Sequence, residues 1–152
     1  MMVPVVRRIL LISLLTGLVA CASPGSVQPT SMRQGEVVFA GGDRLRVRIA
    51  ETPAERAAGL MHVMALPPND GMAFVFGGPV TDRFWMKDTL IPLSIAFWDE
   101  AGRIVGIRDM DPCTADPCPT YGSPEPYVGA LEVDQGFFAQ HGVVIGDRIE
   151  LS

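Results

Sequence analysis

Residues 44–49 alternate strictly between arginine and an aliphatic side chain, with leucine, valine and isoleucine at the aliphatic positions. A period of two places the aliphatic side chains on one face of an extended strand and the arginines on the other, so this segment is predicted to be a half-buried β-strand. A second strand is expected at residues 36–39, because the Gly-Gly-Asp sequence at 41–43 is typical of a tight turn. The pattern therefore predicts a β-hairpin near the start of the domain.

Further apolar runs, separated by turn-forming residues, predict more strands. The sequence Asp-Glu-Ala-Gly at residues 99–102 favours a turn between two of them. Strands and helices do not alternate regularly, so the pattern favours a mainly β fold, a compact antiparallel barrel or sandwich with one or two short helices. The additional strands are expected at residues 71–76, 93–98, 104–108, 127–133 and 148–151.

Two short helices are expected between the strands. Thr52, Pro53 and Glu55 combine an N-cap hydroxyl, a proline at the first helical position and a glutamate three residues after the cap, which is the pattern of a capping box. This helix is expected to end at Gly59. Residues 134–141 are predicted to form one or two further helical turns.

The first twenty residues differ from the rest of the chain. An apolar run at residues 9–19 follows two arginines and ends just before Cys21, which is the layout of a secretory signal. The run is shorter than the roughly 20 apolar residues of a transmembrane helix. It resembles a bacterial lipoprotein signal, which implies that Cys21 is lipidated and becomes the first residue after cleavage. The alanine after Cys21, by resemblance to Gram-negative lipoproteins, favours the periplasmic side of the outer membrane.

The chain is therefore expected to comprise a signal peptide at residues 1–20, a lipidated cysteine and flexible linker at 21–34, and a single β-rich domain at 35–152. Its formal net charge of −5 becomes −7 without the signal peptide, which carries two arginines and no acid. Nucleic-acid binding is not expected, because it requires clustered Lys and Arg, and Lys87 is the only lysine. The expected membrane attachment then depends on the lipid anchor.

Several motifs occur in order along the chain: ERAAGLM at 55–61, DGMAFVF at 70–76, FWMKDTLIPL at 84–93, LEV at 131–133, and Gly136, Gly142 and Gly-Asp at 146–147. Together they resemble the bacterial and archaeal family called domain of unknown function 192, over about residues 36–151. The resemblance implies a compact, mainly β fold and no assigned activity. The chain departs from the family pattern at Lys87, where asparagine is usual, and at Ser94, where aspartate is frequent.

Four side chains with different chemistry lie close together in the densest of these motifs: Trp85, Lys87, Asp88 and Thr89. An aromatic face, a cation, a carboxylate and a hydroxyl suit a small polar ligand or a sugar, and a ligand site would leave Trp85 and Lys87 partly exposed on one concave face. A structural interpretation stays open. In it the tryptophan packs in the core, the aspartate and threonine cap a turn, and the lysine is merely exposed.

Arg56 and Glu132 complete the candidate ligand-binding set. Glu132 lies within an apolar strand, where a carboxylate either faces outward or needs a partner, so a buried ion pair with Arg56 is expected. No catalytic residue is assigned, and the leading hypothesis is a lipid-anchored, extracytoplasmic binding or structural module. The alternative is an envelope enzyme such as a glycan hydrolase, with Asp88 and Glu132 as paired carboxylates about 5 to 10 Å apart in one cleft.

Cys113 and Cys118 lie in a proline-rich segment with four residues between them. Outside the cytoplasm such a pair is predicted to form a local disulfide. The spacing differs from the Cys-x-x-Cys of thiol oxidoreductases, and a zinc site would require two more ligands. No metal or cofactor is expected. The expected partners are the membrane, through the lipid, and a small polar ligand or envelope component.

Overall fold

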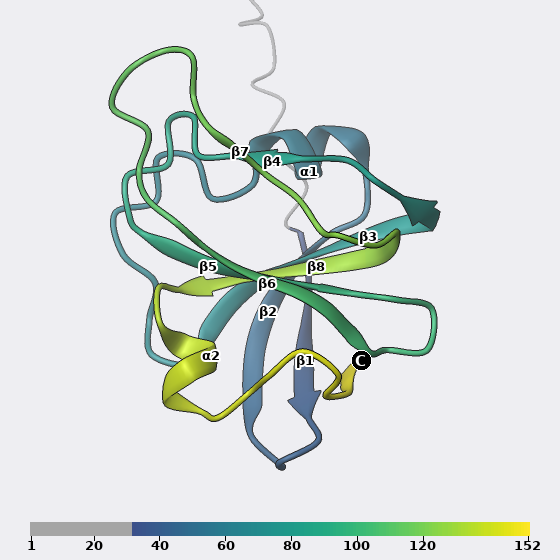
Figure 1. Cartoon of the computed structure of the whole chain (residues 1–152). Helices are drawn as coiled ribbons and strands as arrows, with labels where there is room; N and C mark the ends of the chain where they lie inside the picture. Colours follow the sequence, from purple (N-terminus) through teal and green to yellow (C-terminus); the bar gives the residue numbers. More distant parts are fainter. Residues whose placement is uncertain (1–31) are drawn as a thin grey trace, which may run out of the picture.

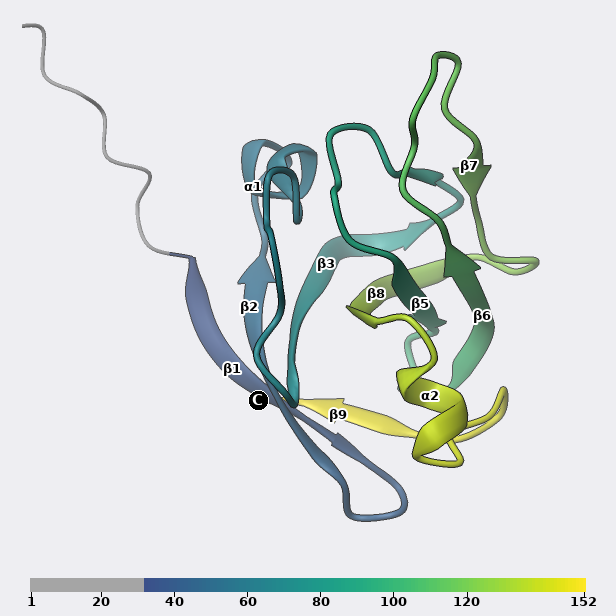
Figure 2. The same ribbon diagram turned by 90° about the vertical axis from the view of Figure 1, so that its left-hand side faces the viewer.

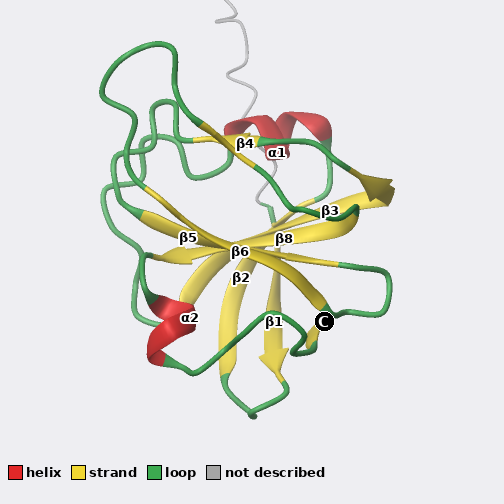
Figure 3. Ribbon diagram, in the orientation of Figure 1, coloured by secondary structure: helices red, strands yellow, loops and turns green. Residues whose placement is uncertain are grey.

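The computed structural model describes residues 32–152, which form one curled β-sheet, a small second sheet and two short helices (Figures 1 and 3). The expected mainly β fold class is confirmed. The predicted signal peptide, Cys21 and most of the linker lie outside the described residues. The strands are β1 (Arg33–Phe39), β2 (Arg44–Ala50), β3 (Asp70–Val80), β4 (Phe84–Trp85), β5 (Leu93–Trp98), β6 (Ile104–Met110), β7 (Thr120–Tyr121), β8 (Tyr127–Asp134) and β9 (Ile149–Leu151); the helices are α1 (Pro53–Ala58) and α2 (Phe137–Gln140).

Seven strands form the main sheet in the order β6-β5-β8-β3-β2-β1-β9. Strands β2 and β3 are parallel, whereas the other neighbouring pairs are antiparallel, so the expected antiparallel arrangement is interrupted once. The sheet curls into a half-barrel (Figure 2). Its two edges meet at one end, where Arg103 bridges Arg148 and the Ile149 N–H donates to the Gly102 carbonyl at 2.9 Å.

The sheet buries side chains on both faces, because successive residues of a strand point to opposite sides. One face carries a first core, which includes Leu131 and Val133 of β8 together with Phe138 of α2. The other face carries a second core around Phe74 of β3. Glu132 lies between two residues of the first core and therefore faces the second, where a charged side chain is unusual.

Helix α1 has the boundaries that its capping pattern predicts. The Glu55 N–H donates to Thr52 Oγ1 at 3.2 Å, and the Thr52 N–H donates to Glu55 Oε2 at 2.8 Å, so both halves of the capping box are present. The helix ends at Gly59, whose φ of 46° lies in the left-handed region that favours glycine. The turn that follows places Leu60 in the second core.

The structure differs from the sequence prediction at α2 and at the small sheet. Strand β8 continues to Asp134, so α2 covers only part of the predicted 134–141 segment. The Gly136 N–H donates to Ser94 Oγ at 2.9 Å, which connects the start of α2 to β5. Strands β4 and β7, which the sequence did not indicate, pair to form the second sheet. No helix within residues 32–152 is long and apolar enough to cross a membrane.

Candidate functional site

A pocket lies where α1, the turn after it and β4 cover the second core. We call it the Glu132 pocket, and it encloses about 280 Å³, including solvent at its mouth. Four of the six sequence-predicted site residues line it, and Lys87 and Asp88 line a different pocket. The lining residues are those at 56–61, Phe74, Phe84, Trp85, Thr89 and Glu132.

Glu132 is the most unusual residue of this pocket. It is only 5% exposed, and within residues 32–152 its carboxyl makes no hydrogen bond or ion pair. In this part of the chain, every side-chain oxygen or nitrogen that is fully shielded from solvent has a hydrogen-bond partner. Because the Glu132 oxygens have none, they are not fully shielded, and they open into the pocket that Glu132 lines. Burial raises the pKa of Glu132 to about 8, because desolvation disfavours the ionised form. The carboxyl is therefore protonated at neutral pH.

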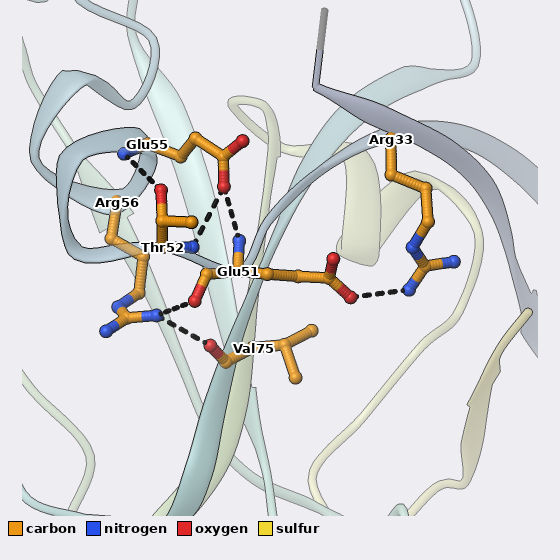
Figure 4. Close-up of polar contacts among 6 residues, drawn as sticks. All are labelled: Arg33, Glu51, Thr52, Glu55, Arg56 and Val75. Carbon is orange, nitrogen blue, oxygen red and sulfur yellow. Dashed lines mark hydrogen bonds and ion pairs between the residues drawn. The ribbon is translucent and has the colours of Figure 1, made fainter. Parts of the chain in front are cut away.

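The expected ion pair between Arg56 and Glu132 is not present in the described part of the chain. Arg56 Nη1 instead donates to two backbone carbonyls, that of Glu51 at 2.5 Å and that of Val75 at 3.0 Å (Figure 4). The Arg56 guanidinium also lies 4.8 Å from the centre of the Phe76 ring. Backbone carbonyls take the hydrogen bonds of Arg56 that the sequence prediction gave to the Glu132 carboxylate, and Glu132 has no partner among residues 32–152.

The beginning of β1 is attached to the same end of the domain. Arg33, the first residue of β1, forms an ion pair at 2.9 Å with Glu51, the residue whose carbonyl accepts from Arg56 (Figure 4). The described part of the chain therefore begins beside α1, which forms one wall of the Glu132 pocket.

Trp85 and Lys87 lie next to each other on the surface. Trp85 is 51% exposed, and the Lys87 ammonium lies 5.8 Å from the centre of its ring. Lys87 Nζ also lies 3.9 Å from Asp116 Oδ2, a long and exposed ion pair. Both side chains are partly exposed, but Trp85 lines the Glu132 pocket and Lys87 does not.

Asp88 and Thr89 form part of a turn. Asp88 has a φ of 54°, in the left-handed region, and its carbonyl accepts from the His62 N–H at 2.8 Å. Thr89 is 6% exposed, and its hydroxyl donates to the Lys87 carbonyl at 3.4 Å. Asp88 lines a different pocket from Glu132, so the two carboxyls do not form the single cleft that a paired-carboxylate hydrolase requires.

The pocket that Asp88 lines lies against the loop of the two cysteines. The sulfurs of Cys113 and Cys118 lie 2.09 Å apart, at the distance of a disulfide bond. We call this the disulfide pocket; it is also lined by Lys87 and Asp116. Among residues 32–152, no three His, Cys, Asp or Glu side chains lie together as metal ligands would.

Sequence reasoning missed the apolar wall of the Glu132 pocket. Leu60, Phe74 and Phe84 contribute this wall, and all three lie in motifs that carry the family resemblance. Their position in those motifs was the available signal. Apolar residues in short runs are ordinarily assigned to the core, and these three do pack in or against the second core. The sequence pattern therefore could not show that they also line a pocket.

Comparisons with known proteins agree on the domain. The family model for domain of unknown function 192, described as an uncharacterized ACR, matches residues 36–151. The structure is similar to that of a candidate transcription regulator from Sinorhizobium meliloti 1021, with 32% identity and a TM-score of 0.74, over 82% of this chain and 98% of that one. It is also similar to a protein of unknown function from Novosphingobium aromaticivorans DSM 12444, with 30% identity and a TM-score of 0.70, over 85% and 94% of the two chains. No curated protein gives a significant match.

Proposed function

Because the chain belongs to the family called domain of unknown function 192, whose description assigns no activity, we propose a function from its own residues. It is a lipid-anchored domain of the cell envelope that binds a small ligand in the Glu132 pocket. The observation that carries the binding function is the Glu132 carboxyl, which is buried, has no partner in residues 32–152 and opens into a pocket. A carboxyl of this kind destabilises the fold unless water or a ligand in the pocket bonds to it.

A ligand would supply the missing partner. The carboxyl has a strongly raised pKa and lies in a pocket, a combination that makes it a candidate for a functional site. Trp85 adds an exposed aromatic ring at the mouth, and Thr89 adds a buried hydroxyl. The site combines hydrogen-bonding groups with apolar walls, which is the usual composition of a small-molecule site.

The envelope location rests on the sequence before the domain. The apolar run and Cys21 support cleavage and lipidation, which would place the domain outside the cytoplasm, on the outer membrane of a Gram-negative cell. The disulfide geometry of Cys113 and Cys118 is compatible with an oxidising compartment. The net charge of −5 argues against DNA binding by this chain.

A ligand screen on residues 32–152 tests the binding function. This segment is suitable because the Sinorhizobium chain, matched over 98% of its length, consists of little more than this domain. Small polar compounds are screened by thermal shift against the wild type, Glu132→Leu and Glu100→Gln, the last a matched control on an exposed turn. Compounds that bind the pocket should stabilise the wild type and the control but not Glu132→Leu. Hits that stabilise all three equally, or a screen without hits, would refute the binding function.

A further inference from the structure

The chemistry of the Glu132 pocket identifies a class of ligand, an inference that rests on the proposed binding function. We infer that the pocket takes a small acyl compound, a carboxylic acid or its amide, whose oxygen accepts a hydrogen bond from the Glu132 carboxyl. Three features of the pocket support this assignment: a carboxyl that donates, an arginine that disfavours amines, and apolar walls of limited extent.

The first feature is the hydrogen-bonding capacity of the pocket floor. Burial raises the pKa of Glu132 to about 8, so at neutral pH the carboxyl has an O–H to donate and, in the described residues, nothing to receive it. Thr89 contributes a hydroxyl whose one hydrogen bond, to the Lys87 carbonyl, is long at 3.4 Å. A carbonyl or carboxylate oxygen is the complementary partner for these donors.

The second feature is the charge around the carboxyl. Arg56 lines the pocket from α1, and its two hydrogen bonds both use Nη1. Lys87 approaches the ring of Trp85 at the mouth. On the sheet, Glu132 pairs with Met72 of β3 and Ile95 of β5, neither of which is charged. The next residue of β8 on the same face is Asp134. Of these two cations only Arg56 lines the pocket, because Lys87 lines the disulfide pocket and is paired with Asp116. The charge of Arg56 repels an ammonium group and tolerates or attracts an anion.

The third feature is the apolar wall. Leu60, Phe74 and Phe84 form one side of the pocket. Its volume of about 280 Å³ includes open solvent, so the enclosed space is smaller and leaves room only for a small ligand. A ligand that fits has a short apolar body beside its oxygen-bearing group. A short acyl chain meets both requirements, whereas a highly charged or extended molecule meets neither.

Three compounds with the same three-carbon chain test the inference: propanamide, propanoate and propylamine. Each is titrated by NMR into residues 32–152 at about pH 6 and about pH 9, where none of the three changes its charge appreciably. The indole N–H of Trp85 and the backbone N–H of Gly59 report on the pocket. Propanamide, propanoate or both should shift these signals. The affinity for propanamide should fall roughly tenfold at the higher pH, because about a tenth of Glu132 then keeps its proton.

Variants separate the carboxyl from its surroundings. Glu132→Gln keeps an N–H donor that does not titrate, so it should bind propanamide equally at both pH values. Glu132→Leu should bind neither acyl probe, and Glu100→Gln should retain the wild-type pH dependence. Tighter binding of propanoate than of propanamide would assign the site to carboxylates, with Arg56 contributing. Tighter binding of propanamide would assign it to neutral acyl groups, and equal affinities would show that the pocket accepts both.

Two results would overturn the inference. In the first, propylamine binds most tightly, with an affinity that rises with pH; the pocket is then a cation site, and the proposed binding function stands. An absence of shifts with all three probes would also refute the acyl class. In that case the ligand screen on Glu132→Leu decides separately whether the pocket binds anything.

Discussion

Replacing Glu132 with glutamine should stabilise the domain at neutral pH, because the wild-type carboxyl opposes folding once the unfolded state ionises. The pKa of Glu132 is raised from an ordinary value of 4.5 to about 8 in the folded domain. Below 4.5 both states hold the proton, and the residue carries no ionic penalty. Between 4.5 and about 8 only the unfolded state loses it, so the free energy of unfolding falls by about 1.4 kcal/mol per pH unit.

The size of the effect follows from this interval. At pH 7 the wild type should be less stable than Glu132→Gln by about 3 kcal/mol, and above pH 8 by roughly 5 kcal/mol, given the difference between 4.5 and about 8. Near pH 4.5 the two proteins should be equally stable. Glutamine has almost the same shape as protonated glutamate, so the pocket should retain its packing.

Urea denaturation of residues 32–152 at several pH values from about 4.5 to 8.5 measures this difference. Asp134 also has a pKa raised by burial, but it is present in both proteins and does not contribute to the difference between them. Glu100→Gln, on an exposed turn, should follow the wild type at every pH. If the free energies of unfolding of wild type and Glu132→Gln changed in parallel with pH, the interpretation of Glu132 as a buried, unpaired carboxyl would be refuted. A variant less stable than the wild type at pH 7 would refute it as well.

Three further predictions concern the anchor, the loop and the helix. Cys21→Ser should move the full-length protein from membrane to soluble fractions, or leave the signal uncleaved, and mass spectrometry of the wild type should find diacylglycerol on Cys21; an unmodified mature cysteine would contradict the anchor. Replacing Cys113 and Cys118 together with serine should lower the free energy of unfolding by about 2 kcal/mol, and thiol labelling of the native wild type should find neither sulfur free. Thr52→Ala should cost about 1 kcal/mol in urea denaturation, with serine restoring most of it, because the hydroxyl accepts the Glu55 N–H.

The parts of the fold that sequence predicted well are those determined by local interactions. The capping box gave the start of α1, because a hydroxyl and a carboxylate three residues apart can satisfy the first backbone N–H groups without help from elsewhere, and Gly59 gave its end. The period-two pattern of β2 likewise placed its buried face correctly. Strands β4 and β7 were missed because each has two residues, too few for a pattern, and their pairing joins distant segments.

The candidate site was predicted less completely, for a related reason. Sequence identified Glu132 as anomalous, since a glutamate between Leu131 and Val133 must face something unusual. The sequence analysis predicted the wrong partner for Arg56. The actual partners are the backbone carbonyls of Glu51 and Val75, and every residue has a carbonyl, so residue type does not reveal them. Contacts between side chains and distant backbone depend on the path of the whole chain.

The ion pair between Arg33 and Glu51 has a consequence for how the domain would encounter its ligand. If Cys21 carries the lipid, the tether reaches the domain beside α1, and its eleven residues from 22 to 32 span at most about 40 Å. The domain, and with it the Glu132 pocket, would then be confined to a thin layer of solvent above the lipid surface and would not diffuse through the whole compartment. For a ligand concentrated in that layer, such a restriction raises the effective concentration without any additional contact. A pocket of modest affinity would be occupied there and empty elsewhere.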